Sequence, residues 1–297
     1  MLTYEFAALG AATCWALTAL ISAGPAGHLG APAFNRLRQV FVALLLGAYV
    51  GISGDWQQLN AQNIPPILLS GLIGIFAGDT LLFASLNRIG PRRSSILFSM
   101  NAPLAAILGW IVLGEALDPQ AILGVALTFS GVAMAIYFGS SRAQTHRWEE
   151  VKGALWIGVG LGLAAAACQA VASLIMRPVM ASGIDPFAAS MLRVAIAAMA
   201  LTAMMQLPIP AIRQKSPLTF RVFAVTALTG FLALAIGMTL LLFALSGGNV
   251  GIVSTLSATS PVIILPLIWL RTGHRPAAGA WGGALIVIVG MALIFTR

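Results

Sequence analysis

One carboxylate, that of Asp79, stands well inside an apolar stretch of the chain. If that stretch crosses a bilayer, an ionised side chain there costs at least ~2.5–3.5 kcal/mol, so it must face protein or water. Two roles fit such a group. It can contact a substrate ammonium or carry a proton, or it can pair structurally with a helix end or with a basic residue such as Arg38. Phe83 is a candidate for the apolar border of the same site.

Arg38 and Arg193 each follow a leucine at matching positions in two further apolar stretches. Each lies about a turn and a half inside its stretch, a depth from which an arginine can reach the lipid headgroups. We therefore expect both side chains to snorkel to the membrane surface. The alternative is that they bind a substrate carboxylate.

Trp15 and Gln169 each follow a cysteine at corresponding points of two other apolar stretches. A glutamine at that depth must satisfy its amide within the protein or in a wet cavity. Trp15 can supply a flat apolar wall for such a cavity or take part in ordinary packing. We count both residues as candidates for a substrate cavity.

Two prolines, Pro103 and Pro261, are expected to kink apolar helices, because proline lacks a backbone donor and displaces the carbonyl of the preceding turn. Broken membrane helices offer their freed backbone groups to polar ligands. The alternative is a structural kink whose loose carbonyls are satisfied by nearby hydroxyls. The polar cavity candidates around these prolines are Ser99, Asn101, Ser254, Ser257 and Thr259.

The composition indicates which elements must hold these residues. Of 297 residues, 59% are hydrophobic and only 8% are charged, whereas soluble domains carry about 25% charged residues. Lipid as the outer solvent explains the deficit. The net charge of +8 does not indicate nucleic-acid binding, because no basic stripe is interleaved with aromatic residues.

Ten stretches reach the length of about 20 residues that a helix needs to cross the hydrocarbon core. Helices are required because unpaired backbone groups are not tolerated in lipid. We predict an all-α membrane protein with ten transmembrane helices. They lie near 3–22, 32–51, 65–86, 94–113, 120–138, 153–174, 187–206, 219–244, 249–270 and 277–295.

The chain reads as two five-helix units, 1–139 and 153–297, joined by a polar linker, 140–152. Four glycines recur after 159 positions, and Met238 stands where the first unit has Asp79. Because five is odd, the second unit must be inverted, an architecture of secondary transporters whose binding site lies between the repeats. The glycines provide close helix packing; they are Gly71 and Gly230, Gly78 and Gly237, Gly124 and Gly283, and Gly131 and Gly290.

Lysine and arginine gather in the gaps after helices 3, 5, 7 and 9, eleven residues against two on the opposite side. Cytoplasmic loops carry this excess, so both termini are expected to be non-cytoplasmic, in a cell (inner) membrane. The eleven are Arg88, Arg92, Arg93, Arg142, Arg147, Lys152, Arg213, Lys215, Arg221, Arg271 and Arg275, and the two are Arg177 and Arg297.

The residues 84–91, 94–103 and 109–115 together resemble the EamA family of the drug/metabolite transporter superfamily, with a second copy between Phe243 and Trp269. The resemblance implies a ten-helix exporter of amino acids or related metabolites, similar to bacterial exporters of aromatic and other amino acids. It also implies a central cavity between helices 1, 3, 4, 6, 8 and 9. Glu115 ends helix 4 as the family pattern expects, but 271–275 lacks the second acidic residue.

Other classes of function find no support in the sequence. It has no P-loop for ATP hydrolysis and no HExxH metal motif, and Cys14 and Cys168 form neither a disulfide framework nor a metal site. We expect a monomeric, non-enzymatic exporter of amino acids without cofactor or metal, working by alternating access. The alternatives are an exporter of hydrophobic cations, which needs a membrane-embedded anion such as Asp79, and a non-transporting membrane subunit.

Overall fold

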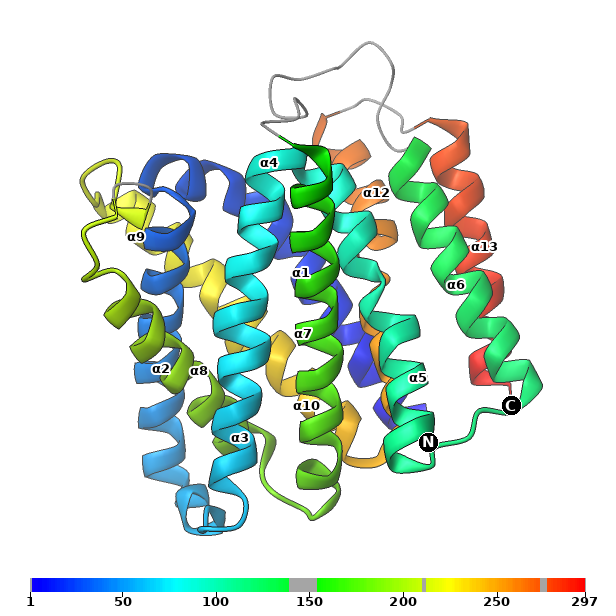
Figure 1. Cartoon of the computed structure of the whole chain (residues 1–297), viewed down its shortest axis with the longest axis horizontal. Helices are drawn as coiled ribbons and strands as arrows, with labels where there is room; N and C mark the ends of the chain where they lie inside the picture. The colour runs from blue at the N-terminus through cyan, green and yellow to red at the C-terminus, as the bar shows by residue number, and fades with distance from the viewer. Residues whose placement is uncertain (1, 139–153, 210–211, 273–276, 297) are drawn as a thin grey trace.

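The computed structural model describes residues 2–138, 154–209, 212–272 and 277–296 as a bundle of helices, with no strand in these ranges (Figure 1). The predicted linker, 140–152, lies outside the described residues. Six helical segments are long and apolar enough to cross a membrane, and three shorter apolar helices accompany them. The protein is therefore a multi-pass, all-helical membrane protein.

The first half of the chain forms six α-helices and two short segments of other helix types. They are α1 (Leu2–Leu29), α2 (Ala31–Ser53), the 3-10 turn η1 (Asp55–Gln58), α3 (Ile64–Ser70), the π-helix η2 (Gly71–Ala77), α4 (Gly78–Ser99), α5 (Asn101–Leu113) and α6 (Pro119–Phe138).

The second half contains a similar series. It consists of α7 (Leu155–Ala181), α8 (Pro186–Met204), α9 (Phe220–Gly230), the π-helix η4 (Phe231–Gly237), α10 (Met238–Gly247), α11 (Val250–Ser257), α12 (Ser260–Thr272) and α13 (Ala278–Phe295).

Local sequence explains where several of these helices begin and end. Gly54, with φ of 83°, ends α2 in the left-handed conformation, and its N–H donates to the carbonyl of Val50. Asp185 begins α8 by accepting hydrogen bonds from the N–H groups of Phe187 and Ala188. The breaks between α4 and α5 and between α11 and α12 fall just before Asn101 and Ser260, two positions and one position ahead of a proline.

Between α3 and α5 the structure corrects the sequence interpretation. The sequence suggested a gap between two helices at residues 87–93, but helical structure continues through it as part of α4. In Figure 1 the chain ascends through α3 and descends through α5, so α4 holds the reversal between them. Gly90 and Pro91 are in this stretch, and proline is a common cause of sharp helix bends.

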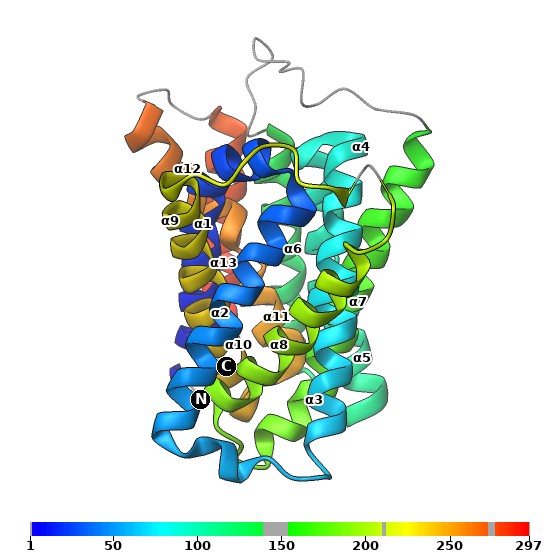
Figure 2. The ribbon, with the colours of Figure 1, turned by 90° about the vertical axis from the view of Figure 1, so that its left-hand side faces the viewer.

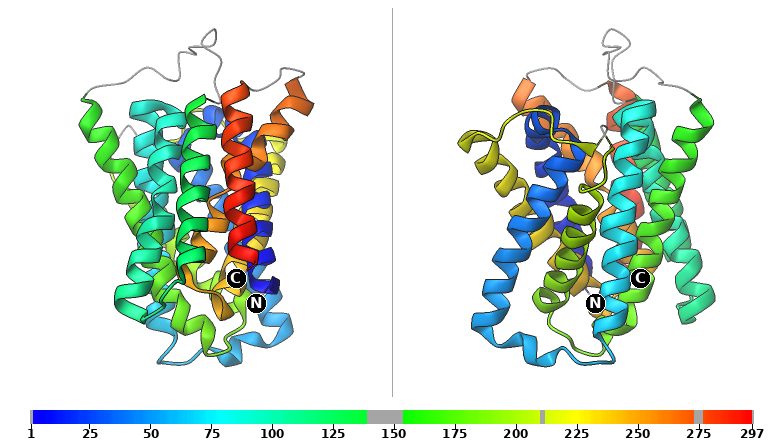
Figure 3. Two further views of the ribbon diagram at one scale, coloured as in Figure 1. Left: turned by 90° about the vertical axis from the view of Figure 1, so that its right-hand side faces the viewer. Right: turned by 60° about the vertical axis from the view of Figure 1, so that its left-hand side comes forward.

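The helices pair in a pattern that crosses the two halves. α6 packs against α13 and α2 packs against α8, so each of these helices contacts its counterpart in the other half (Figures 2 and 3), and α5 packs against α11. α4 packs against α7, and α1 packs against η4 and α10. Because α7 corresponds to α1 and α10 corresponds to α4, the contact of α4 with α7 is the counterpart of the contact of α1 with α10.

Candidate functional site

A buried polar face on α2 begins the site. Asn35, Arg38 and Gln39 follow the spacing that puts side chains on one side of a helix, and they are 2%, 9% and 0% exposed. Several of their polar atoms have no hydrogen-bond partner: Asn35 Oδ1, Arg38 Nε and both ends of the Gln39 amide. Buried polar groups without partners are uncommon in proteins and indicate a place where a ligand or water completes the bonding.

Asp79, the second residue of α4, faces this polar surface. Its carboxylate is enclosed by protein, accepts a hydrogen bond from the Asn35 side chain and is attracted by Arg38, with a smaller attraction from Arg193. The side chain still keeps some accessible surface. Arg38 is thus the basic residue whose charge acts most strongly on the Asp79 carboxylate.

Arg193 on α8 is the most deeply buried charge of the site, with 1% of its surface exposed. Its Nη1 lies 3.1 Å from the sulfur of Met238, and its Nε has no partner. The expectation that Arg38 and Arg193 snorkel to the headgroups is wrong. Their side chains turn into the bundle, where α2 and α8 pack against each other, α2 packs against η4, and α8 packs against η2 and α10.

Small residues let the backbones approach closely around the arginines. A Cβ on Gly71 would lie 2.7 Å from the carbonyl oxygen of Arg193, and a Cβ on Gly230 would lie 3.2 Å from that of Arg38. A Cβ on Gly74 would come within 3.2 Å of Arg193 Nη2. These glycines let the backbone of Arg193 pack on η2 and the backbone of Arg38 pack on the end of α9, and Gly74 leaves room for the Arg193 guanidinium.

Two π-helices, η2 and η4, lead directly into Asp79 and Met238. A π-helical turn is rare, frees carbonyl groups and occurs frequently at functional sites. The sequence interpretation missed both, although Gly71, Gly78, Gly230 and Gly237 mark their ends. The glycine pairs were the one feature of the sequence that pointed to these segments.

Trp15 and Gln169 lie at equivalent places beside these π-helices. Trp15 Nε1 donates to the carbonyl of Ala233 in η4 over 3.1 Å, and Gln169 Oε1 lies 3.9 Å from a Cβ built on Gly74 in η2. Both side chains are partly exposed. The structure therefore places Trp15, Asp79, Gln169 and Met238 around the same pair of π-helices.

The polar residues near the prolines are used locally. Asn101 donates to the Phe98 carbonyl over 2.7 Å, and Ser257 and Thr259 donate to carbonyls three residues earlier in the chain over 3.0 and 2.7 Å. Ser99 and Ser254 are buried, and Phe83 is partly exposed on α4. The bonds of Asn101, Ser257 and Thr259 match the structural alternative, in which polar side chains satisfy the carbonyls at a helix break.

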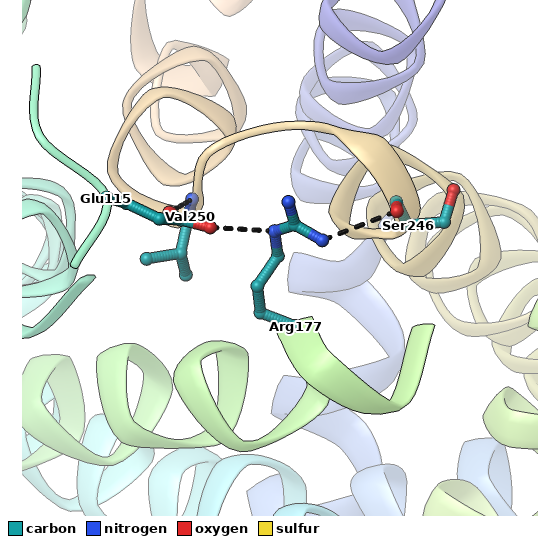
Figure 4. Close-up of polar contacts among 4 residues, drawn as sticks. All are labelled: Glu115, Arg177, Ser246 and Val250. Carbon is teal, nitrogen blue, oxygen red and sulfur yellow. Dashed lines mark hydrogen bonds and ion pairs between the residues drawn. The ribbon is translucent and has the colours of Figure 1, made fainter. Parts of the chain in front are cut away.

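A second ionic contact lies at the end of α5 (Figure 4). Arg177 Nε donates to Glu115 Oε1 over 2.8 Å, while Glu115 Oε2 accepts from the N–H of Val250 over 2.7 Å, at the first residue of α11. Arg177 Nη1 also donates to the Ser246 carbonyl over 3.3 Å. Glu115 thus ties the end of α5 to α7 and to the start of α11. The sequence interpretation noted Glu115 without finding this partner.

Comparison with known proteins fits this arrangement. A sequence model of the EamA-like transporter family matches the chain twice, over residues 2–137 and 156–296. The chain belongs to the EamA-like transporter family. Its EamA relatives are transporters, not enzymes. The two matched regions coincide with the two halves whose helices pair in the structure.

Curated relatives of this EamA chain are bacterial. It is 29% identical over 98 residues to the uncharacterized transporter YyaM of Bacillus subtilis (strain 168), covering 33% of this chain and 32% of the relative. It is 29% identical over 134 residues to the threonine/homoserine exporter RhtA of Escherichia coli (strain K12), covering 45% and 43%. The chain thus spans less than half the length of these relatives in the matched regions.

A protein of known crystal structure shares the fold. Its superposition has a TM-score of 0.77 with 17% sequence identity, and it covers 98% of this chain and 96% of the other. At that identity the likeness concerns the fold alone.

Proposed function

We propose that this chain exports amino acids across the bacterial inner membrane as a secondary transporter, by alternating access between two inverted five-helix halves, 1–139 and 153–297. Ten helices then cross the bilayer, and both termini, which lie at the same end of the bundle in Figure 1, are non-cytoplasmic. The chain works as a monomer in this proposal.

The observation that carries the proposal is the duplicated centre. Arg38 lies with Asp79 in one set of helices, and Arg193 lies with Met238 in the equivalent set. Binding sites of transporters with inverted repeats lie where the repeats meet, near unwound or irregular helix segments. The π-helices η2 and η4 supply such segments here.

The choice of amino acids rests on charge and on the named relative. The centre offers both an anionic group, Asp79, and cationic groups, Arg38 and Arg193, which suits a zwitterion. RhtA, similar over less than half of its length, carries the name of a threonine/homoserine exporter. We propose a broad range that includes aromatic amino acids, with Trp15, Gln169 and Phe83 beside the substrate.

The rival substrate class is hydrophobic cations. Two arginines surround the single carboxylate, so the centre as a whole is positive and repels a cation. The experiment is uptake of a panel of radiolabelled amino acids, with threonine and phenylalanine among them, into proteoliposomes in competition with lipophilic cationic dyes. Uptake of amino acids that the dyes leave unaffected supports the proposal. Dye transport without amino-acid uptake overturns it.

A further inference from the structure

The two halves treat their buried arginines differently. Asp79 and Met238 are the second residue of α4 and the first residue of α10, and each follows its π-helix. Arg38 is attracted to the carboxylate of Asp79, whereas the equivalent Arg193 directs Nη1 to a thioether sulfur. The first half supplies an anion for its arginine, and the second half places a neutral side chain at the corresponding position.

This difference leaves two buried positive charges beside one carboxylate. Two guanidinium groups share one carboxylate, and Arg38 exerts the larger attraction on it. Thioether sulfur is a weak hydrogen-bond acceptor, and Arg193 Nε has no partner at all. A buried charge is stable only when it is paired and hydrogen-bonded, so Arg193, 1% exposed and sharing Asp79 with Arg38, calls for a further anion.

We propose that Arg193 anchors the carboxylate of the transported substrate, which takes the place that an acidic side chain at position 238 would occupy. Guanidinium and carboxylate groups match in a two-pronged geometry with charge-assisted hydrogen bonds. The pair that the substrate forms with Arg193 is then the counterpart of the attraction between Asp79 and Arg38. This inference rests on the proposed function for the identity of the cargo as an amino acid, and it adds that the carboxylate, rather than the amine, is the group selected at Arg193.

The wild-type protein gives the first test. Uptake of radiolabelled L-phenylalanine into proteoliposomes is competed with two deletion analogues, 3-phenylpropionate, which lacks the amine, and phenethylamine, which lacks the carboxylate. Because charge-assisted bonds to a buried arginine are lost without the carboxylate, phenethylamine should compete about ten- to a hundred-fold more weakly than 3-phenylpropionate. Equal competition by the two analogues overturns the proposal.

A variant that supplies the missing anion gives the second test. Met238→Asp should neutralise Arg193 from within the chain, raise the KM for phenylalanine by about ten-fold or more, and abolish the preference for 3-phenylpropionate. Met238→Leu is the matched control, because it changes the same side chain without charge and should retain the preference. An unchanged KM in Met238→Asp contradicts the proposal.

A binding measurement separates this inference from the proposed function. In detergent, 3-phenylpropionate should raise the Tm of the wild-type protein and of Met238→Leu but not of Met238→Asp. If no amino acid is transported while this pattern holds, the carboxylate site stands and amino-acid export fails. If amino acids are transported while phenethylamine competes as well as 3-phenylpropionate, export stands and the role of Arg193 fails. Met238→Asp should also fold at least as stably as Met238→Leu, because its carboxylate lies beside the buried Arg193.

Discussion

Gly124 and Gly290 face each other across the contact between α6 and α13. A Cβ on Gly124 would lie 2.8 Å from the carbonyl oxygen of Gly290, and a Cβ on Gly290 would lie 2.7 Å from that of Gly124. The counterpart contact is also present, because a Cβ on Gly131 would lie 2.6 Å from the carbonyl oxygen of Gly283. Two related units packed around a local two-fold axis make matched contacts of this kind.

The same reciprocity recurs around the polar centre. Gly71 in the first half packs on the backbone of Arg193 in the second, and Gly230 packs on the backbone of Arg38. Gly78 lies against Cys168, and Gly237 lies against Cys14. These exchanged contacts support the proposal of two inverted repeats with the buried arginines between them.

The first prediction concerns the glycine contact of α6 with α13. Gly131→Ala would place a Cβ 2.6 Å from the Gly283 carbonyl oxygen, so the helices must separate. Overpacking of this kind costs about 1–3 kcal/mol, and the Tm in detergent should fall. Gly47→Ala is the control, since nothing lies within 4 Å of its Cβ, and alanine in a helix should stabilise by about 0.5–1 kcal/mol. An equal Tm for both variants would refute tight packing at Gly131.

The second prediction concerns orientation in the membrane. Asn60, between η1 and α3, and Gln214, between α8 and α9, are both exposed. In a Cys14→Ser, Cys168→Ser background, a membrane-impermeant maleimide should label Asn60→Cys in intact cells. Gln214→Cys should react only after the membrane is opened, because its side carries the excess of basic residues. The reverse labelling pattern would show that the orientation is opposite to the one proposed. Equal labelling of Asn60→Cys and Gln214→Cys in intact cells would contradict the placement of these two loops on opposite sides of the membrane.

The third prediction concerns Asp79 and Arg38. Asp79→Asn leaves two buried guanidinium groups without a carboxylate, and loss of one partner of a buried pair destabilises by about 3–5 kcal/mol. Adding Arg38→Gln should recover part of that loss, because one of the two unpaired charges disappears. Melting of the single and double variants in detergent measures the coupling, with Asp55→Asn in the loop after α2 as the control. Additive effects of the two substitutions would show that the side chains are independent.

The fourth prediction concerns Glu115. Glu115→Ala removes the partner of Arg177 and the acceptor of the Val250 N–H, and hydrogen bonds to charged groups contribute about 1.5–3 kcal/mol each. Glu115→Gln keeps an acceptor and should lose less. The side chains of Arg177 and Glu115 are 20% and 13% exposed. Because salt screens partly exposed charges, added salt should reduce the difference in Tm between Glu115→Gln and wild type. An equal Tm for Glu115→Gln and wild type would mean that the charge of Glu115 contributes nothing.

Much of the fold follows from composition and spacing. A chain with so few charged residues is stable only in lipid. In lipid its backbone N–H and C=O groups must bond to each other, which an α-helix achieves. The continuation of α4 through residues 87–93 was not predictable in the same way, because the sequence there carries Gly90, Pro91 and three arginines that usually mark a loop. Neighbouring helices decide whether such a segment stays helical.

The electrostatic centre was harder to predict. Arg38 and Arg193 stand at a depth that permits snorkelling, and only the packing of α2 against α8 decides that they turn inward. The contact between Glu115 and Arg177 joins residues 62 positions apart, and no local pattern encodes it. Long-range pairings of this kind depend on the assembled bundle.

Counterflow tests the account of a carrier with alternating access most directly. Proteoliposomes loaded with unlabelled phenylalanine are diluted into trace radiolabelled phenylalanine without any imposed gradient of protons or other ions. The account predicts transient accumulation of label above its equilibrium level, because the site that releases phenylalanine outside returns loaded with label. Met238→Asp should lose this accumulation. Label that never exceeds the level of protein-free liposomes, for phenylalanine or for threonine, would contradict the account.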